Sequence, residues 1–184
     1  MPQDSWLFTG TVRSNLDMGN EHTDEELWKV ISQAKLDNVA KGWWLGLDHE
    51  VHEKGGNLSA GTCQLLCLAR VLLKRPKILF LDEATASVDI ETDKLVQETI
   101  RSPGVLPPDC SIVTVAHRLH TVIDYDKIVV LSLGKVVEEG SPHELLQKEG
   151  HFASFVKDTG ASSAKELERR AALAHGAAAP EASP

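Results

Sequence analysis

The chain has 184 residues, enough for one domain with a sizeable hydrophobic core but not for two of ordinary size. Its formal net charge of -8 argues against nucleic acid as a partner, because the phosphate backbone attracts basic surfaces. No apolar run approaches the roughly 20 residues of a membrane-spanning helix, so we expect no transmembrane segment. The N-terminus has neither the basic start nor the apolar stretch of a secretory signal.

The first third of the chain predicts one clear helix. Residues 5–12 alternate loosely and are typical of an edge strand or a loop. Thr23 can cap a helix, and Glu26 completes a capping box three residues later. The apolar stripe that follows consists of Leu27, Val30, Ile31 and Ala34. Residues 41–57 are rich in Gly, Trp and charge, and we expect them to be irregular.

Residues 59–73 show a strong helical pattern that ends in Lys, Arg and Pro. The run contains two of the three cysteines, Cys63 and Cys67, on one helix face, where they suit either a metal site or simple burial. We favour burial because their neighbours are apolar, and the cysteines indicate a reducing compartment. The eight histidines form no HxxxH or HExxH spacing, so zinc is not predicted.

Two continuous apolar runs follow, and each ends in residues that can do chemistry. Ile78–Leu81 leads into Asp82 and Glu83, a helix is expected from Ile90 to Ile100, and Ser111–Ala116 leads into His117. Such runs are typical of strands buried on both faces of a parallel sheet. Strands alternating with helices predict an α/β fold whose ligands bind beyond the carboxyl ends of the strands. We therefore expect both acids and the histidine on the same rim.

The last third predicts a hairpin, a capped helix and a tail. Residues 127–132 and 135–138 flank Gly134 as a β-hairpin, and Ser141 caps a helix with proline at its first position. From Gly160 the composition shifts to Ala, Ser, Glu, Arg and Pro. We expect Gly160–Pro184 to be a mostly disordered tail, with at most a short helix from Lys165 to Ala174.

An acid at the tip of an apolar strand is how phosphoryl-transfer enzymes hold magnesium, and the following Glu83 could polarise an attacking water. Two solvated carboxylates are an equally good interpretation of this pattern alone. Ser59, Ala60 and Gly61 begin a helix, whose free N–H groups and dipole form an anion site. By itself, that pattern is better explained by an ordinary Ser cap. A lone histidine such as His117 is usually structural.

Taken together and in this order, the segments resemble the nucleotide-binding domain of ATP-binding cassette (ABC) transporters. LSAGT resembles the signature motif, ILFLDE the Walker B motif, and SVD the D-loop, while His117 matches the H-loop and Gln3 in MPQD the Q-loop. The resemblance covers residues 1–159 and implies a partial P-loop NTPase-type ABC ATPase domain, a parallel sheet core with a helical subdomain that carries the signature. FTGTVRSNLD and NLSAGTCQLLCLAR are similar to the C class, the multidrug resistance-associated proteins, and to the second of its two cassettes.

The resemblance implies a role for each matching residue and binding of ATP with Mg²⁺. Gln3 and Asp82 would bind magnesium, Gln3 also contacting the attacking water. Glu83 would be the general base and His117 would hold the terminal phosphate. Two cassettes pair head to tail in this family, so Ser59, Ala60 and Gly61 would face ATP on the partner cassette.

The resemblance also implies contacts beyond the nucleotide. Asp89 would lie at the interface between the two cassettes, and residues 6–15 would lie near the membrane domains. Trp6 and Phe8 suit that contact or plain packing equally well. The cassette would sit on the cytosolic face of a membrane as part of an exporter.

The sequence departs from the family pattern in two places. No segment matches GxxxxGK[ST], the Walker A loop that cradles phosphates, so we expect an N-terminal portion to be absent and the chain to be inactive alone. Ala60 and Thr62 replace the usual Gly and Gln of the signature, which fits the weaker ATP site of the C class. A non-catalytic module pairing with an intact cassette, and a soluble ABC ATPase, are the alternatives.

Overall fold

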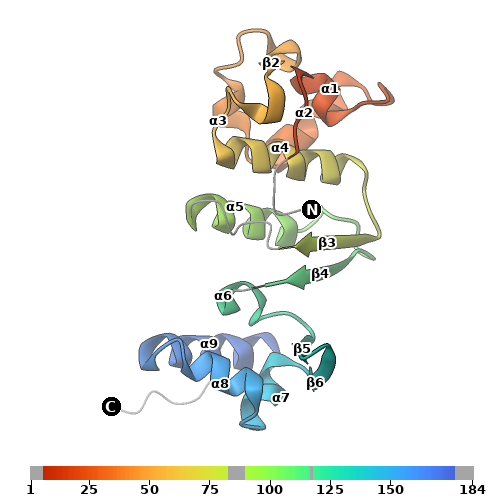
Figure 1. Cartoon of the computed structure of the whole chain (residues 1–184). Helices are drawn as coiled ribbons and strands as arrows, with labels where there is room; N and C mark the ends of the chain where they lie inside the picture. The colour runs from red at the N-terminus through yellow and green to blue at the C-terminus, as the bar shows by residue number, and fades with distance from the viewer. Residues whose placement is uncertain (1–5, 83–89, 117, 177–184) are drawn as a thin grey trace. The chain divides into compact units, whose positions relative to one another are not determined.

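The structure is a computed structural model that describes residues 6–82, 90–116 and 118–176 (Figure 1). It contains two compact units, a first unit of residues 1–115 and a second unit of residues 116–184. Among the described residues, no helix is long and apolar enough to cross a bilayer.

The first unit opens with a small helical part built around helix α4. Thr23 and Glu26 form the predicted capping box at the start of α2, and the predicted apolar stripe is buried. Residues 41–57, predicted to be irregular, contain only short elements. In chain order the elements are β1 (Gly10–Thr11), α1 (Val12–Leu16), α2 (Asp24–Gln33), α3 (Asp37–Ala40), η1 (Gly46–Asp48), β2 (Glu50–Val51), η2 (Glu53–Gly55) and α4 (Ala60–Leu73).

The other elements described in the first unit are a parallel pair of strands and a helix that lies between them in sequence. β3 (Ile78–Asp82) pairs with β4 (Ser111–Val115) in the register that places Asp82 opposite Val115, and α5 (Ile90–Arg101) connects them. The prediction of a parallel α/β arrangement is confirmed.

The expected burial of both strand faces is wrong for these described residues. Leu79 and Leu81 lie in the core with residues of α4 and α5, whereas the alternate side chains Ile78 and Phe80 are 55% and 62% exposed. Because side chains alternate along a strand, a two-stranded pair whose helices cover one face leaves the other face open.

The described residues of the second unit form a hairpin and four helices. The predicted hairpin is present, with a two-residue turn at Leu133 and Gly134, both of which have positive φ as a type I′ turn requires. Ser141 caps α7 as predicted, with Pro142 at the first helical position. The elements are α6 (Leu119–Val122), β5 (Ile128–Ser132), β6 (Lys135–Gly140), α7 (Pro142–Gln147), α8 (His151–Lys157) and α9 (Ala161–Ala174).

Helix α9 contains the short helix expected from Lys165 to Ala174, but it is longer and better packed than a mostly disordered tail from Gly160 would be. It spans Ala161–Ala174 and buries Leu167 completely, in a core shared with Phe152 of α8. Arg170 also bonds to the carboxylate of Asp124 at 3.2 Å. The alanines of α9 have little apolar surface each, but they let the helix approach its neighbours closely, so composition alone understated the packing. Residues 177–184 lie outside the described residues.

Candidate functional site

The start of α4 carries the predicted signature residues. Ser59 has extended backbone angles, and its hydroxyl accepts a hydrogen bond from the amide of Thr62 at 3.1 Å. The same hydroxyl lies 2.9 Å from the Thr62 hydroxyl, and the Cys63 amide donates to the Ser59 carbonyl. Ser59 is thus an N-cap, the simpler of its two interpretations. A cap of this kind also fixes the positive end of the helix, where anions bind.

The three residues predicted to face a nucleotide differ in exposure. Ser59 and Ala60 are exposed, whereas Gly61 is buried. A Cβ atom on Gly61 would lie 2.6 Å from the hydroxyl oxygen of Thr92 in α5. The start of α4 therefore exposes two of these residues to solvent and packs the third against a neighbouring helix.

The carboxyl ends of the two parallel strands lie side by side, as predicted. Asp82, the last residue of β3, is exposed at this edge opposite the last residue of β4. The other predicted site residues lie outside the described residues: Gln3, Glu83, Asp89 and His117.

Segment 6–15 is fastened to α4 by one arginine. Arg70 donates from Nε to the carbonyl of Asn15 at 2.6 Å, from Nη1 to the carbonyl of Trp6 at 3.0 Å, and from Nη2 to Asn15 Oδ1 at 3.2 Å. Asn15 is 1% exposed, and its side chain forms hydrogen bonds with other residues of segment 6–15. It accepts from the Phe8 amide at 3.1 Å and donates to the carbonyls of Phe8 and Thr11. Arg70 and Asn15 together hold this segment in one conformation.

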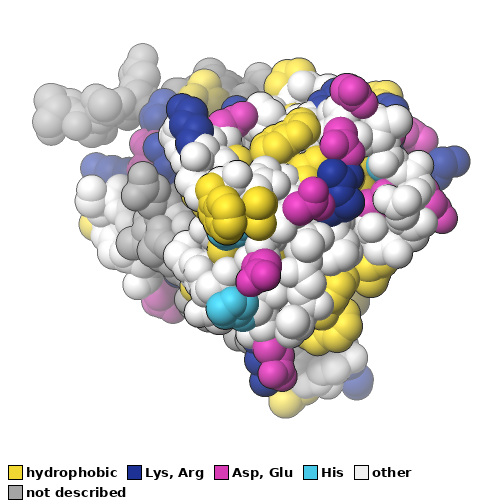
Figure 2. All heavy atoms as spheres, turned by 90° about the horizontal axis from the view of Figure 1, so that it is seen from above, with side chains coloured by type: hydrophobic (Ala, Val, Ile, Leu, Met, Phe, Trp, Pro, Cys, Tyr) yellow, Lys and Arg dark blue, Asp and Glu magenta, His cyan; other side chains and the backbone are white. Residues whose placement is uncertain are grey.

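The two aromatic residues of this segment behave differently. Trp6 is 64% exposed and Phe8 is half-buried, with their ring centroids 6.3 Å apart. Plain packing therefore explains Phe8 better than Trp6. Apolar side chains reach the surface among acidic and basic ones on the face of the molecule seen from above (Figure 2).

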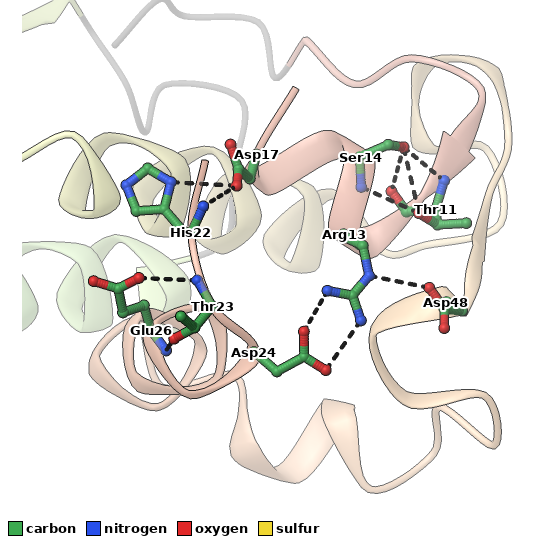
Figure 3. A network of polar contacts seen from close by, with 9 residues as sticks. All are labelled: Thr11, Arg13, Ser14, Asp17, His22, Thr23, Asp24, Glu26 and Asp48. Carbon is green, nitrogen blue, oxygen red and sulfur yellow. Dashed lines mark hydrogen bonds and ion pairs between the residues drawn. The ribbon is translucent and has the colours of Figure 1, made fainter. Parts of the chain in front are cut away.

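A second arginine braces the same part of the molecule (Figure 3). Arg13 forms a bidentate ion pair with Asp24, the first residue of α2. Its Nε also donates a hydrogen bond to the carboxylate of Asp48 at 3.2 Å. The hydrogen bond to Asp24 raises the pKa of Arg13, and the same contact lowers the pKa of Asp24. Both ion pairs lie at the surface, where such pairs contribute little to the free energy of folding. Their main effect is therefore to orient α1.

Asp17 is the buried acid of this network. Burial alone would raise its pKa, but the hydrogen bond from the His22 amide at 2.8 Å and the nearby His22 imidazole lower it. A carboxyl whose pKa is lowered in the folded state stabilises the fold above its unfolded pKa, near 4, and loses that contribution as the pH falls through the folded pKa.

We expect Asp17→Asn to lower the free energy of unfolding at pH 7 by about 1–2 kcal/mol. The difference from the parent chain should shrink as the pH falls below about 4, because the parent then loses its carboxylate. Urea unfolding at a series of pH values measures this. A difference that is the same at pH 7 and pH 3 would contradict the charge-based explanation.

The two cysteines of α4 are buried and free, as the sequence favoured. Burial raises the pKa of the Cys63 thiol and of the Cys67 thiol. A neutral, buried thiol is a poor nucleophile, whereas Cys110 is half-exposed.

We therefore expect one thiol per folded chain to react rapidly with Ellman's reagent and three to react after unfolding in guanidinium. Cys110→Ser should abolish the rapid phase, and Cys63→Ser should leave it unchanged. A rapid phase that survives in Cys110→Ser would show that α4 is open to solvent.

Sequence reasoning missed Arg70 and Thr92. Arg70 lies three residues beyond Cys67 and seven beyond Cys63, so it belongs to the same helix face. A charged side chain on an otherwise buried stripe signals a buried polar partner, and this spacing would have identified Arg70. No comparable signal identifies Thr92, because its contact depends on how α4 and α5 pack.

Comparisons with known proteins match the chain to one family. The family model described as ABC transporter matches residues 1–86. Human ATP-binding cassette sub-family C member 2 is 52% identical over 160 residues, 87% of this chain and 10% of that protein. ABC transporter C family member 3 of Dictyostelium discoideum is 49% identical over 172 residues, 93% of this chain and 12% of that protein. The chain thus spans about a tenth of the length of these relatives.

A solved structure supports the same assignment. The structure of a bacterial Atm1-family ABC exporter with ATP bound matches with a TM-score of 0.77 and 34% sequence identity, over 87% of this chain and 28% of that one. The chain therefore belongs to the ABC transporter family, with the P-loop NTPase-type fold of an ABC ATPase domain. Within the family it is a C-class nucleotide-binding domain, of the kind found in the multidrug resistance-associated proteins.

Proposed function

We propose that this chain forms part of the ATP-hydrolysing cassette that powers an ABC exporter of organic anions, conjugates or drugs, on the cytosolic face of a membrane. The observation that carries the proposal is the exposed start of α4, with Ser59 and Ala60 at the positive end of a capped helix. A phosphate group is the natural ligand of such a helix end. The likeness to C-class transporters and to an ABC exporter supports this choice of ligand.

The described residues fit a magnesium nucleotide. Asp82 is an exposed carboxylate at the carboxyl end of a parallel strand, the type of ligand that Mg²⁺ prefers. In this proposal Asp82 and Gln3 hold the ion, which when bound neutralises charge on the phosphate oxygens. Glu83 accepts a proton from the attacking water, and His117 donates a hydrogen bond to the terminal phosphate.

Two surfaces of the chain would meet partners. Ser59, Ala60 and Gly61 serve the ATP of a second cassette that pairs head to tail, and Asp89 lies at that interface. Residues 6–15 contact the transmembrane domains. The exposure of Trp6 suits such a contact, and the bonds from Arg70 give the segment the fixed shape that a docking surface needs.

The altered signature supports assignment to the second cassette of a C-class protein, at the weaker ATP site. Ala60 adds a methyl group to the exposed surface that would approach phosphate. Thr62 is buried, with its hydroxyl beside that of Ser59, so its side chain serves the helix cap.

A calorimetric titration of the chain with Mg-ATP tests what the chain does alone. Because no segment matches the Walker A loop, we expect no binding or millimolar binding, and no hydrolysis. Micromolar binding would contradict this, as would hydrolysis that Glu83→Gln abolishes. The phosphates would then be held by a segment other than a Walker A loop.

A second candidate function is a non-catalytic module that completes the ATP site of an intact cassette. The exposed Ser59 and Ala60 favour it, because they can act in trans. The test adds the chain to a C-class cassette that is intact except for its own signature, which has been disabled by substitution. Restored Mg-ATP hydrolysis would show that this chain supplies a working signature, and loss of that restoration in Ser59→Ala would assign it to the start of α4.

A further inference from the structure

The buried glycine of the signature packs closely against the side chain of Thr92. Gly61 is the second residue of α4, and Thr92 lies in the first turn of α5 and is 8% exposed. A Cβ on Gly61 would lie 2.6 Å from Thr92 Oγ1 and 3.4 Å from Thr92 Cγ2, and real Cβ atoms essentially never approach another heavy atom within 3.0 Å. The two helices can therefore pack this closely only with glycine at position 61.

Backbone conformation does not explain this glycine. Gly61 lies within a helix and does not have the positive φ that favours glycine at positions such as Gly55 and Gly134. In a helix, glycine is less favourable than alanine by about 1 kcal/mol. The space taken by Thr92 is the feature of the structure that requires it.

We propose that Thr92 is a positioning residue for the signature. By packing on Gly61 it fixes the start of α4 against the start of α5, and so holds Ser59 and Ala60 where a partner cassette presents its nucleotide. Asp89, assigned above to the cassette interface, directly precedes α5 in the sequence. The contact therefore links the two segments that would face the partner. This inference rests on the proposed function.

The contact itself is tested by unfolding the chain and its variants. Gly61→Ala should lower Tm by about 3–8 °C, because an added methyl group in a close contact is destabilising. In a Thr92→Ala background the same change should cost at most about 1 °C, because the two tight contacts with Thr92 would be gone and the Cβ of residue 92 would lie at an ordinary 3.5 Å from the new methyl.

Thr92→Val is the matched control, because valine keeps a branched side chain against position 61. Gly61→Ala should remain costly in the Thr92→Val background. The inference is overturned if Gly61→Ala costs the same in the Thr92→Ala background as in the parent chain. It is also overturned if valine at position 92 relieves the cost as well as alanine does.

The positioning role is tested in the trans complementation assay with Mg-ATP. Gly61→Ala alone should raise the chain concentration needed for half-maximal restoration by about tenfold or more, the factor that corresponds to about 1.4 kcal/mol. The double variant Gly61→Ala/Thr92→Ala should behave like Thr92→Ala alone.

A double variant that regains its Tm but not its complementation would show that restored packing does not restore the signature, which overturns the positioning role of Thr92. Failure of the proposed function looks different, since the unmodified chain would then restore no hydrolysis. The unfolding experiments still decide the Gly61–Thr92 contact in that case.

Discussion

Arg70→Met should lower the free energy of unfolding of the first unit by about 2–4 kcal/mol. The substitution removes three charge-assisted hydrogen bonds, to the carbonyls of Asn15 and Trp6 and to the side chain of Asn15. It also leaves the Asn15 carbonyl without this donor in a part-buried position, and an unsatisfied group there costs more than the bond contributed. Methionine keeps most of the aliphatic length, so little packing is lost.

Urea unfolding followed by tryptophan fluorescence measures this loss. Arg70→Lys should fall between the parent chain and Arg70→Met, because lysine keeps the charge but cannot reproduce the planar fork of donors. Arg75→Met is the matched control: Arg75 is exposed just beyond α4, and its loss should change stability by less than about 0.5 kcal/mol.

Hydrogen exchange separates this local effect from general destabilisation. The Phe8 amide donates to Asn15, whose side chain Arg70 holds, so its exchange should accelerate more in Arg70→Met than that of the amides in α5. If Arg70→Met matched Arg75→Met in stability and left exchange at Phe8 unchanged, segment 6–15 would not depend on Arg70.

Leu167→Ala should destabilise the second unit by about 2–5 kcal/mol. Leu167 is fully buried in α9, in the core that also contains Phe152 and Val156 of α8. Truncating a buried leucine loses its transfer free energy and leaves a cavity. A large effect requires that α9 be packed, so the experiment directly tests the finding that corrects the predicted tail.

Leu173→Ala is the control in the same helix. Leu173 is 55% exposed, so the substitution should change stability by less than about 0.5 kcal/mol. Thermal unfolding followed by circular dichroism compares the two variants. Equal, small effects would mean that α9 contributes no packing, and the tail prediction would then hold in solution.

Local signals in the sequence predicted local structure well. The capping boxes at Thr23 and Ser141, the turn at Gly134 and the helix of α4 are all encoded within a few residues, and each is confirmed. The parallel pairing of β3 and β4 followed from two apolar runs separated by a helix. The predicted edge position of Asp82 followed from that pairing.

Features that depend on packing between elements were not predictable in this way. The Arg70 bonds join residues 55 and 64 positions apart, and the approach of Thr92 to Gly61 depends on how closely two helices meet. A continuous apolar run looks the same in the sequence whether one or both faces of its strand are covered. The open side of β3 could therefore not be foreseen. The catalytic roles of Glu83 and His117 are still predictions, because both residues lie outside the described residues.

The open side of the β3–β4 pair has a consequence for handling the protein. Ile78 and Phe80 of β3 and Val113 and Val115 of β4 form an exposed apolar surface on the two strands. An apolar surface that nothing covers promotes aggregation. Purified alone, the chain should therefore precipitate at moderate concentration. A polypeptide that covers this apolar surface should raise the yield of soluble chain.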